Sequence, residues 1–255
     1  MDRKRYVFEE QSSGRPYSRQ NLESGHNDNC CVVFEGTKLV FAGETERFSK
    51  IKHDSSNPHL ALESFMLHNN LNYSDMDNFT ESAIEHDQHK NHIFESLYQS
   101  GFYESAVLVV DRWGDHDDCI TLAFMKQGEE PIIFRRFESS NSPCAMYYDV
   151  ALAIFGREHS EGKLMGLSGY GKDSNKKYIR WNEVKKSIEV DSLLALKDVE
   201  SIKTQCSDVM ALKDIAYTVQ KNFEDTIVSV IKYFYGILKQ NGYCTKNLCM
   251  SGGVF

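Results

Sequence analysis

The strongest hydrophobic signal in the chain is the unbroken apolar run 106–110, which predicts a strand buried on both faces of a sheet. Two more β-prone runs follow at 119–125 and 132–137, with turn-forming residues between them. Apolar residues then recur at helical spacing over 145–155. This part of the chain therefore predicts three consecutive strands followed by a helix.

The N-terminal part of the chain carries a weaker version of the same pattern. Residues 30–34 and 38–42 are short β-prone runs joined by a glycine-containing turn, which predicts a hairpin. Helical spacing of apolar residues predicts a helix over 60–67, and 80–85 is a candidate short strand. The polar residues 1–23 are expected to form a lead-in or tail outside the folded units.

Downstream of the strands the pattern changes twice. Five glycines fall within residues 156–172, and an amphipathic helix is then predicted over 207–240. A last strand, 247–250, runs into Gly252 and Gly253. Because such a strand usually feeds a helix whose N-terminal amides bind phosphate, these glycines are candidate phosphate-binding residues. No helix follows them, so the second folded unit is expected to be truncated.

The order of these elements predicts the fold class. Three strands followed by a helix open a ribonuclease-H-like unit, and the earlier hairpin and helix indicate a first, degenerate copy. We therefore expect an α/β protein with a first unit over 24–104 and a second, incomplete unit over 105–255.

Composition and charge exclude several classes of protein. The chain has 255 residues, 41% of them hydrophobic, which suffices for a core, but its longest apolar run is far shorter than the roughly 20 residues of a membrane helix. Residues 1–24 lack the apolar segment of a secretory signal. The net charge of −8 and the lack of basic clusters argue against nucleic acid as a partner. Seven cysteines without a C-x-x-C pair indicate reduced thiols, so we expect a cytoplasmic protein.

Histidines and an aspartate flank the strongest predicted strand. His86, His89 and His92 precede it, and Asp111 follows it directly. Residues three or four apart share one helix face, and a buried strand that ends in a carboxylate often presents it at the ligand-binding edge of its sheet. A histidine pair with an aspartate suits a divalent transition metal. The alternative is the solvated start of a polar helix.

Two further clusters carry candidate chemistry. His26 lies in a Gly-His-Asn-Asp segment before a predicted strand, where it could face a ligand, but these residues alone favour a turn with a surface histidine. Lys163 lies in the glycine-rich segment 161–171, where its ammonium group offers a point charge to a phosphate or carboxylate. That segment lacks the P-loop pattern, and a mobile surface loop is the alternative.

Four segments, in order, resemble the N-terminal domain of the O-carbamoyltransferases that act in nodulation and antibiotic tailoring. The first joins residues 25–31 with 44–54 and is similar to the family's G-H-D-A-S and E-E-E-R-F-x-R-x-K-H-D. The second joins 87–102 with 111–115 and resembles H-H-x-x-H-A-A-S-A-F-Y and V-V-D-G-x-G-D.

The third segment is 161–171, and the fourth is 247–254, which is similar to a strand that runs into G-G-V-A-L-N. The resemblance implies an actin/hexokinase-like fold of duplicated ribonuclease-H units, related to the tRNA threonylcarbamoyl transferases. It also implies a C-terminal domain that makes carbamoyl adenylate from carbamoyl phosphate and ATP, and this domain is expected to be absent from the chain.

The resemblance implies a metal site as well. His92 and Asp111 match two of the family's metal ligands. The third family ligand, a histidine, is Gln88 here, so Gln88 or the neighbouring His89 would have to complete the set. The expected metal is divalent iron, with zinc as the alternative.

The predicted function is that of an O-carbamoyltransferase, which passes a carbamoyl group from carbamoyl adenylate to a hydroxyl of a small-molecule acceptor. His26 is the candidate base for the hydroxyl proton, although Asn27 replaces the family's aspartate beside it. Lys163, Gly252 and Gly253 are the candidates for holding nucleotide phosphate. The alternatives are a non-catalytic nucleotide-binding module, or an inactive fragment, of the same family and a tRNA-modifying transferase.

Overall fold

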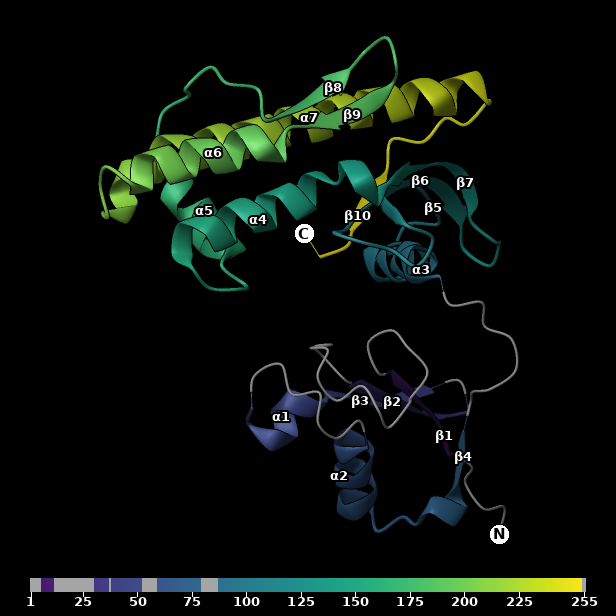
Figure 1. The fold of residues 1–255 in the computed structure, drawn as a ribbon. Coiled ribbons are helices and arrows are strands. Elements are labelled where there is room, and N and C mark those ends of the chain that lie inside the picture. The colour runs from purple at the N-terminus through teal and green to yellow at the C-terminus, as the bar shows by residue number, and fades with distance from the viewer. Residues whose placement is uncertain (1–5, 12–29, 37, 52–58, 79–86, 254–255) are drawn as a thin grey trace. The chain divides into compact units, whose positions relative to one another are not determined.

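The chain divides into two compact units, Met1–Glu85 and His86–Phe255, each with its own sheet and helices (Figure 1). The computed structural model describes residues 6–11, 30–36, 38–51, 59–78 and 87–253. The division lies before the predicted boundary at 104, because the helix that follows residue 87 packs against the second sheet.

The first unit is a four-stranded mixed sheet in the order β3-β2-β1-β4. Its strands are β1 (Tyr6–Gln11), β2 (Cys30–Glu35), β3 (Lys38–Glu44) and β4 (Met76–Asn78). β1 pairs antiparallel with β2 and parallel with β4, so it is a central strand. The expectation of a polar lead-in over 1–23 is therefore wrong for β1, whose short β-prone start is followed by polar residues that hide it in the sequence.

The core of the first unit lies between β2 and one helix. The described residues of this unit include two short helices, α1 (Thr45–Ser49) and α2 (Leu60–Asn69), and the 3-10 turn Tyr73–Asp75 follows them. Alternate residues of β2 point to the same face of the sheet, and its buried Cys31 and Val33 contact the apolar side of α2. The predicted hairpin and helix are confirmed; the predicted strand 80–85 lies outside the described residues.

The sheet of the second unit has the order β10-β5-β6-β7. Its strands are β5 (Glu104–Val110), β6 (Asp118–Lys126), β7 (Ile132–Glu138) and β10 (Leu248–Ser251), all close to the predicted ranges. β5, β6 and β7 form an antiparallel meander, and β10 returns parallel to β5. Strand order and direction thus repeat those of the first sheet.

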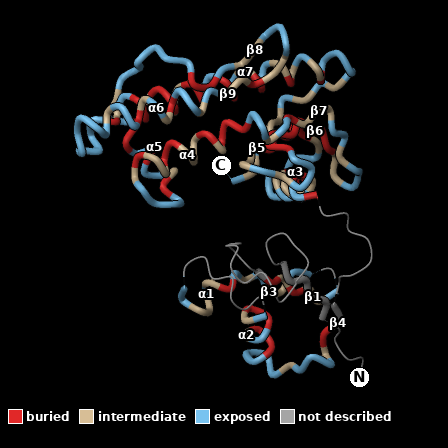
Figure 2. The backbone as a smooth tube through the Cα atoms, viewed as in Figure 1, coloured by how far each residue is buried: buried red, intermediate tan, exposed pale blue. Residues whose placement is uncertain are grey.

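Helices cover both faces of the second sheet. Successive side chains of a strand face opposite sides, and β5 is buried on both. Val107 and Val109 contact α3 (Gln88–Ser100), while Leu108 and Val110 contribute to a larger core that includes α4 (Pro143–Phe155) and α7 (Lys213–Gln240). In Figure 2 the buried positions of α4, α7 and the strands run through the middle of this unit.

The remaining elements of the second unit pack around α4 and α7. They are α5 (Glu161–Ser168), the hairpin β8 (Ile179–Asn182) and β9 (Ser187–Val190), α6 (Ser192–Lys203) and the 3-10 turns Ser139–Asn141 and Val209–Leu212. The alternative of a mobile loop for the glycine-rich segment is wrong for α5, which is a regular helix. Gly171 follows it where a β-carbon would meet the Lys213 carbonyl oxygen at 2.1 Å, so this glycine permits close packing against α7.

Within the described part of the chain, no helix combines the length and apolar character that crossing a bilayer requires. The described part of the chain holds six cysteine side chains. Four are buried and two, Cys206 and Cys244, are exposed.

Candidate functional site

The candidate site lies at the edge where β5 and β10 end side by side. The two strands are parallel and in register, with Ser251 opposite Val109, so their carboxyl ends meet at one edge of the sheet. The first turns of α3 pack against the same two strands. Capping residues determine where α3 begins and ends. The Asp87 side chain accepts a hydrogen bond from Lys90 N at 3.0 Å at the N-terminus, and Gly101 ends the helix with a positive φ of 73°.

His92 and Asp111 meet at this edge. His92 Nε2 lies 3.5 Å from Asp111 Oδ2, and His92 Nδ1 lies 3.1 Å from Ser251 Oγ. Gln88, one helical turn before His92, donates from Nε2 to the same Asp111 oxygen at 3.0 Å. The edge thus brings a histidine, a carboxylate, an amide and a hydroxyl together, and it confirms that His92 and Asp111 are neighbours.

Asp111 is held in its ionised form. Burial by itself raises the pKa of this carboxyl, but the His92 hydrogen bond and the Arg112 backbone amide, which donates to Oδ1 at 2.6 Å, outweigh burial and lower the pKa below its usual value. This negative charge lies beside the His92 imidazole, so the edge places a potential base next to an anion.

His89 does not belong to this group. Its ring is fully buried beneath the sheet, where Nδ1 lies 2.7 Å from Thr121 Oγ1 and 3.2 Å from Asp118 Oδ2. His89 shares its helix face with the core residues Ile93 and Leu97, four and eight positions later. The expectation that His89 supplies the missing metal ligand is therefore wrong, because this face is turned into the core.

A buried ionic network fixes the start of α3 to the sheet. The Arg136 guanidinium on β7 bridges the carboxylates of Asp87 and Asp118. Burial opposes ionisation of both carboxyls, but Arg136, with His89 in the case of Asp118, lowers their pKa values below the usual range. Gly114 allows the β5–β6 loop to approach this network, since its β-carbon would lie 2.1 Å from Asp118 Oδ1.

The described residues do not form a three-ligand metal centre. Among them, no group of three or more His, Cys, Asp or Glu side chains is arranged to hold a metal ion. His92 and Asp111 offer two conventional ligands, and the third member of the cluster, Gln88, presents an amide nitrogen to Asp111. A transition-metal site of the expected kind uses at least three strong protein ligands, so the residues described do not fit it.

The paired glycines, predicted to follow the last strand, lie next to Asp111. Gly252 has a φ of +112° and its β-carbon would meet the Val110 carbonyl oxygen at 2.1 Å, while that of Gly253 would lie 3.2 Å from Asp111 Oδ1. Only a residue without a side chain can turn the chain so closely over the end of β5. The candidate phosphate-binding glycines and the His92–Asp111 pair are thus parts of one site.

The other two predicted residues are not brought to this edge by any described contact. Lys163 lies on α5, with its ammonium 6.0 Å from the Phe155 ring at the far end of α4. His26 lies outside the described residues, so its predicted role as a base stays a prediction.

The sequence analysis missed Arg112, the residue directly after Asp111. Its guanidinium carbon lies 4.0 Å from the Trp113 ring and 3.5 Å from the Tyr148 ring of α4. The sequence held one clue to Arg112: directly after the aspartate at the strand end, the resembling family has a glycine, and this chain has an arginine followed by Trp113.

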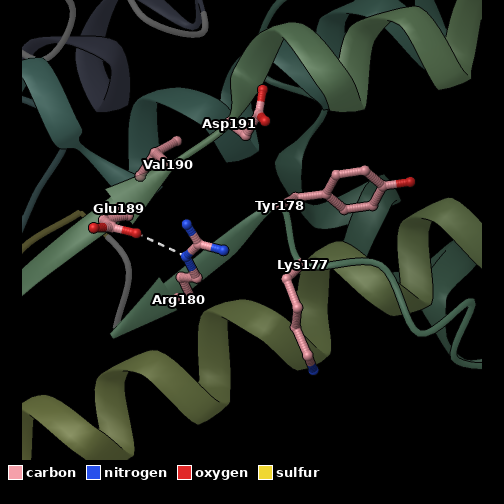
Figure 3. A pocket seen from close by; sticks show the side chains of 6 residues that line it. All are labelled: Lys177, Tyr178, Arg180, Glu189, Val190 and Asp191. Carbon is pink, nitrogen blue, oxygen red and sulfur yellow. Dashed lines mark hydrogen bonds and ion pairs between the residues drawn. The ribbon is translucent and has the colours of Figure 1, made fainter. Parts of the chain in front are cut away.

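A separate cavity of about 180 Å³ lies beside the β8–β9 hairpin (Figure 3). Its lining residues are Lys177, Tyr178, Arg180, Glu189, Val190 and Asp191. Arg180 Nε already donates to Glu189 Oε2 at 2.7 Å, and none of the predicted site residues lines the cavity. Its lining residues, which lie within 177–191, are thus separate from those at the ends of β5 and β10.

No protein-family model matches this chain, and no curated protein sequence matches it significantly.

Proposed function

We propose that this chain is part of an O-carbamoyltransferase that transfers a carbamoyl group from carbamoyl adenylate to a hydroxyl of a small-molecule acceptor, and that its two units are duplicated ribonuclease-H-like units. The observation that carries the proposal is the meeting of His92, Asp111 and the Gly252–Gly253 turn at one strand edge. The repeated strand order of the two sheets supports the duplication. In open α/β sheets this edge is the usual ligand site.

The chain's own residues suggest how the acceptor would be activated. His92 takes the acceptor's hydroxyl proton, and ionised Asp111 stabilises the imidazolium that forms. The hydroxyl oxygen attacks the carbamoyl carbon, and AMP leaves as the C–O bond to its phosphate breaks. Gly252 and Gly253 lie close to the end of β5, and we assign their backbone amides to the adenylate phosphate. No step is assigned to a metal, because the described ligand set is incomplete.

A non-catalytic nucleotide-binding module of the same family is the second candidate. Gln88 favours it, since this side chain stands where the resembling family has a metal-binding histidine and instead hydrogen-bonds Asp111. In such a module the strand edge would bind the nucleotide without transferring the carbamoyl group.

One experiment separates the two candidates. The purified chain is incubated with labelled carbamoyl adenylate, so that transfer does not depend on an adenylate-forming domain, and with a panel of sugar and nucleoside acceptors. AMP release, label transfer and ATP binding are measured. Transfer that falls at least tenfold in His92→Ala, with His68→Ala on the first unit as the control, supports the transferase. ATP binding without transfer supports the module, and neither binding nor transfer contradicts both.

A further inference from the structure

Arg112 occupies the opposite side of the strand end from His92. Because successive residues of a strand alternate between faces, Asp111 at the end of β5 points toward α3 and Arg112 toward α4. There the guanidinium lies close to two aromatic rings, Trp113 from its own loop and Tyr148 from α4. Such contacts hold the planar group in a fixed orientation.

The guanidinium has no anionic partner within the described residues. It forms no ion pair or side-chain hydrogen bond there, and its Nε is buried without a hydrogen-bond acceptor. The two terminal nitrogens are not among the buried unpartnered atoms, so they remain open to solvent. An arginine whose flat faces are packed and whose tip is free presents the geometry that binds a carboxylate or phosphate through two parallel hydrogen bonds.

The charged groups around Arg112 do not neutralise it. Asp149 follows Tyr148 on α4. Burial raises the pKa of its carboxyl above the usual value, and the opposing electrostatic effect of Arg112 does not outweigh burial. Asp111 is adjacent in sequence, but its Oδ1 accepts from the Arg112 backbone and its Oδ2 faces His92 and Gln88. Neither carboxylate pairs with the guanidinium, which leaves its positive charge available to a ligand.

We propose that Arg112, oriented by Trp113 and Tyr148, binds a phosphate oxyanion of the ligand that occupies the strand edge. This rests on the proposed function for the location of the ligand. The phosphate belongs either to a nucleotide or to a small phosphate compound, and the same chemistry recognises both.

Calorimetric titration of the whole chain with two probes, AMP and inorganic phosphate, tests the proposal. Loss of a charge-assisted hydrogen-bond pair weakens binding about tenfold or more, so Arg112→Gln should raise the Kd by that factor. Arg112→Lys keeps the charge but loses the planar tip, and is expected to recover only part of the affinity. The matched control is Arg180→Gln, which removes an arginine already paired with Glu189.

The two probes identify the source of the phosphate. If the Arg112 variants bind both AMP and inorganic phosphate more weakly, Arg112 binds phosphate in general. If only AMP binding is weakened, Arg112 binds the phosphate of a nucleotide. Wild-type protein that binds neither probe, or Kd values that Arg112→Gln and Arg112→Lys leave unchanged, overturns the proposal. Circular dichroism identifies an Arg112 variant that fails to fold. In that case Trp113→Leu, which removes only one stacking ring, is tested instead and is expected to weaken binding. None of these readouts needs carbamoyl transfer, so this proposal and the proposed function can fail separately.

Discussion

His92 Nε2 and Asp111 Oδ2 lie 3.5 Å apart, although one belongs to a helix and the other to the end of a strand. Gln88 contacts the same carboxylate oxygen from one turn earlier in the helix. Positions 88 and 92 therefore share the helix face that meets the strand edge. A histidine at position 88 would stand beside His92 and Asp111 together.

Gln88→His is expected to create a metal site. The change would place two imidazoles at i and i+4 next to a carboxylate, which is a three-ligand set that suits zinc or iron. Zinc affinity should rise at least tenfold over the wild type, measured by calorimetric titration and by metal content after dialysis. Gln99→His, on an exposed turn of the same helix, is the control. Equal zinc affinity in both variants would contradict the geometry described for this edge.

The second unit should lose stability in acid because of Asp118. The folded-state pKa of this carboxyl lies below its unfolded value, so ionised Asp118 stabilises the fold above about pH 4 and this contribution is lost as the pH falls through the folded pKa. Asp87 and Asp111 act in the same direction. Urea unfolding followed between pH 7 and pH 2 should show the free energy of unfolding declining below about pH 5.

Asp118→Asn should flatten that decline. At neutral pH the variant is expected to be about 3 to 5 kcal/mol less stable, because Arg136 and His89 lose a buried charged partner. Glu129→Gln on an exposed turn is the matched charge-removing control and should change stability by less than about 0.5 kcal/mol. An acid profile that is the same in wild type and Asp118→Asn would exclude Asp118 as its source.

Gly252→Ala should loosen the pairing of β10 with β5. A β-carbon there would lie 2.1 Å from the Val110 carbonyl oxygen, and the φ of +112° is strained for any side chain. We expect a loss of about 2 kcal/mol or more in the free energy of unfolding, measured in urea. Gly236→Ala in the C-terminal part of α7, where a β-carbon meets nothing within 4 Å, should instead add about 1 kcal/mol to the free energy of unfolding. The opposite signs of the two changes are the critical result.

Asn222→Ala should destabilise the attachment of the β8–β9 hairpin to α7. The buried Asn222 Oδ1 accepts from the Tyr178 amide at 2.8 Å, and its loss leaves that buried amide unsatisfied. The expected cost is about 1 to 3 kcal/mol, with faster hydrogen exchange at Tyr178 and Ile179. Glu224→Ala, exposed on the same helix, should leave both amides protected. Unchanged exchange in Asn222→Ala would show that this bond does not anchor the hairpin.

The sequence by itself determined the strands and helices that carry a strong apolar pattern. The continuous run of β5 and the stripe of α7 were predictable because burial on two faces, or on one helix face, imposes a period that local composition reveals. The same argument placed Asp111 and the Gly252–Gly253 turn at strand ends, and parallel pairing of the two strands then brought them together. β1 was not predicted, because a short strand that contains polar residues shows no recognisable apolar pattern in the sequence.

Only the tertiary structure decided which side chains meet. His89 and His92 are three residues apart and were expected to act together, but the rotation of α3 that buries Ile93 and Leu97 also buries His89. That rotation turns Gln88 and His92 toward Asp111. Spacing along a helix limits which residues can share a face, whereas the packing of that helix on its sheet selects the face that reaches the site.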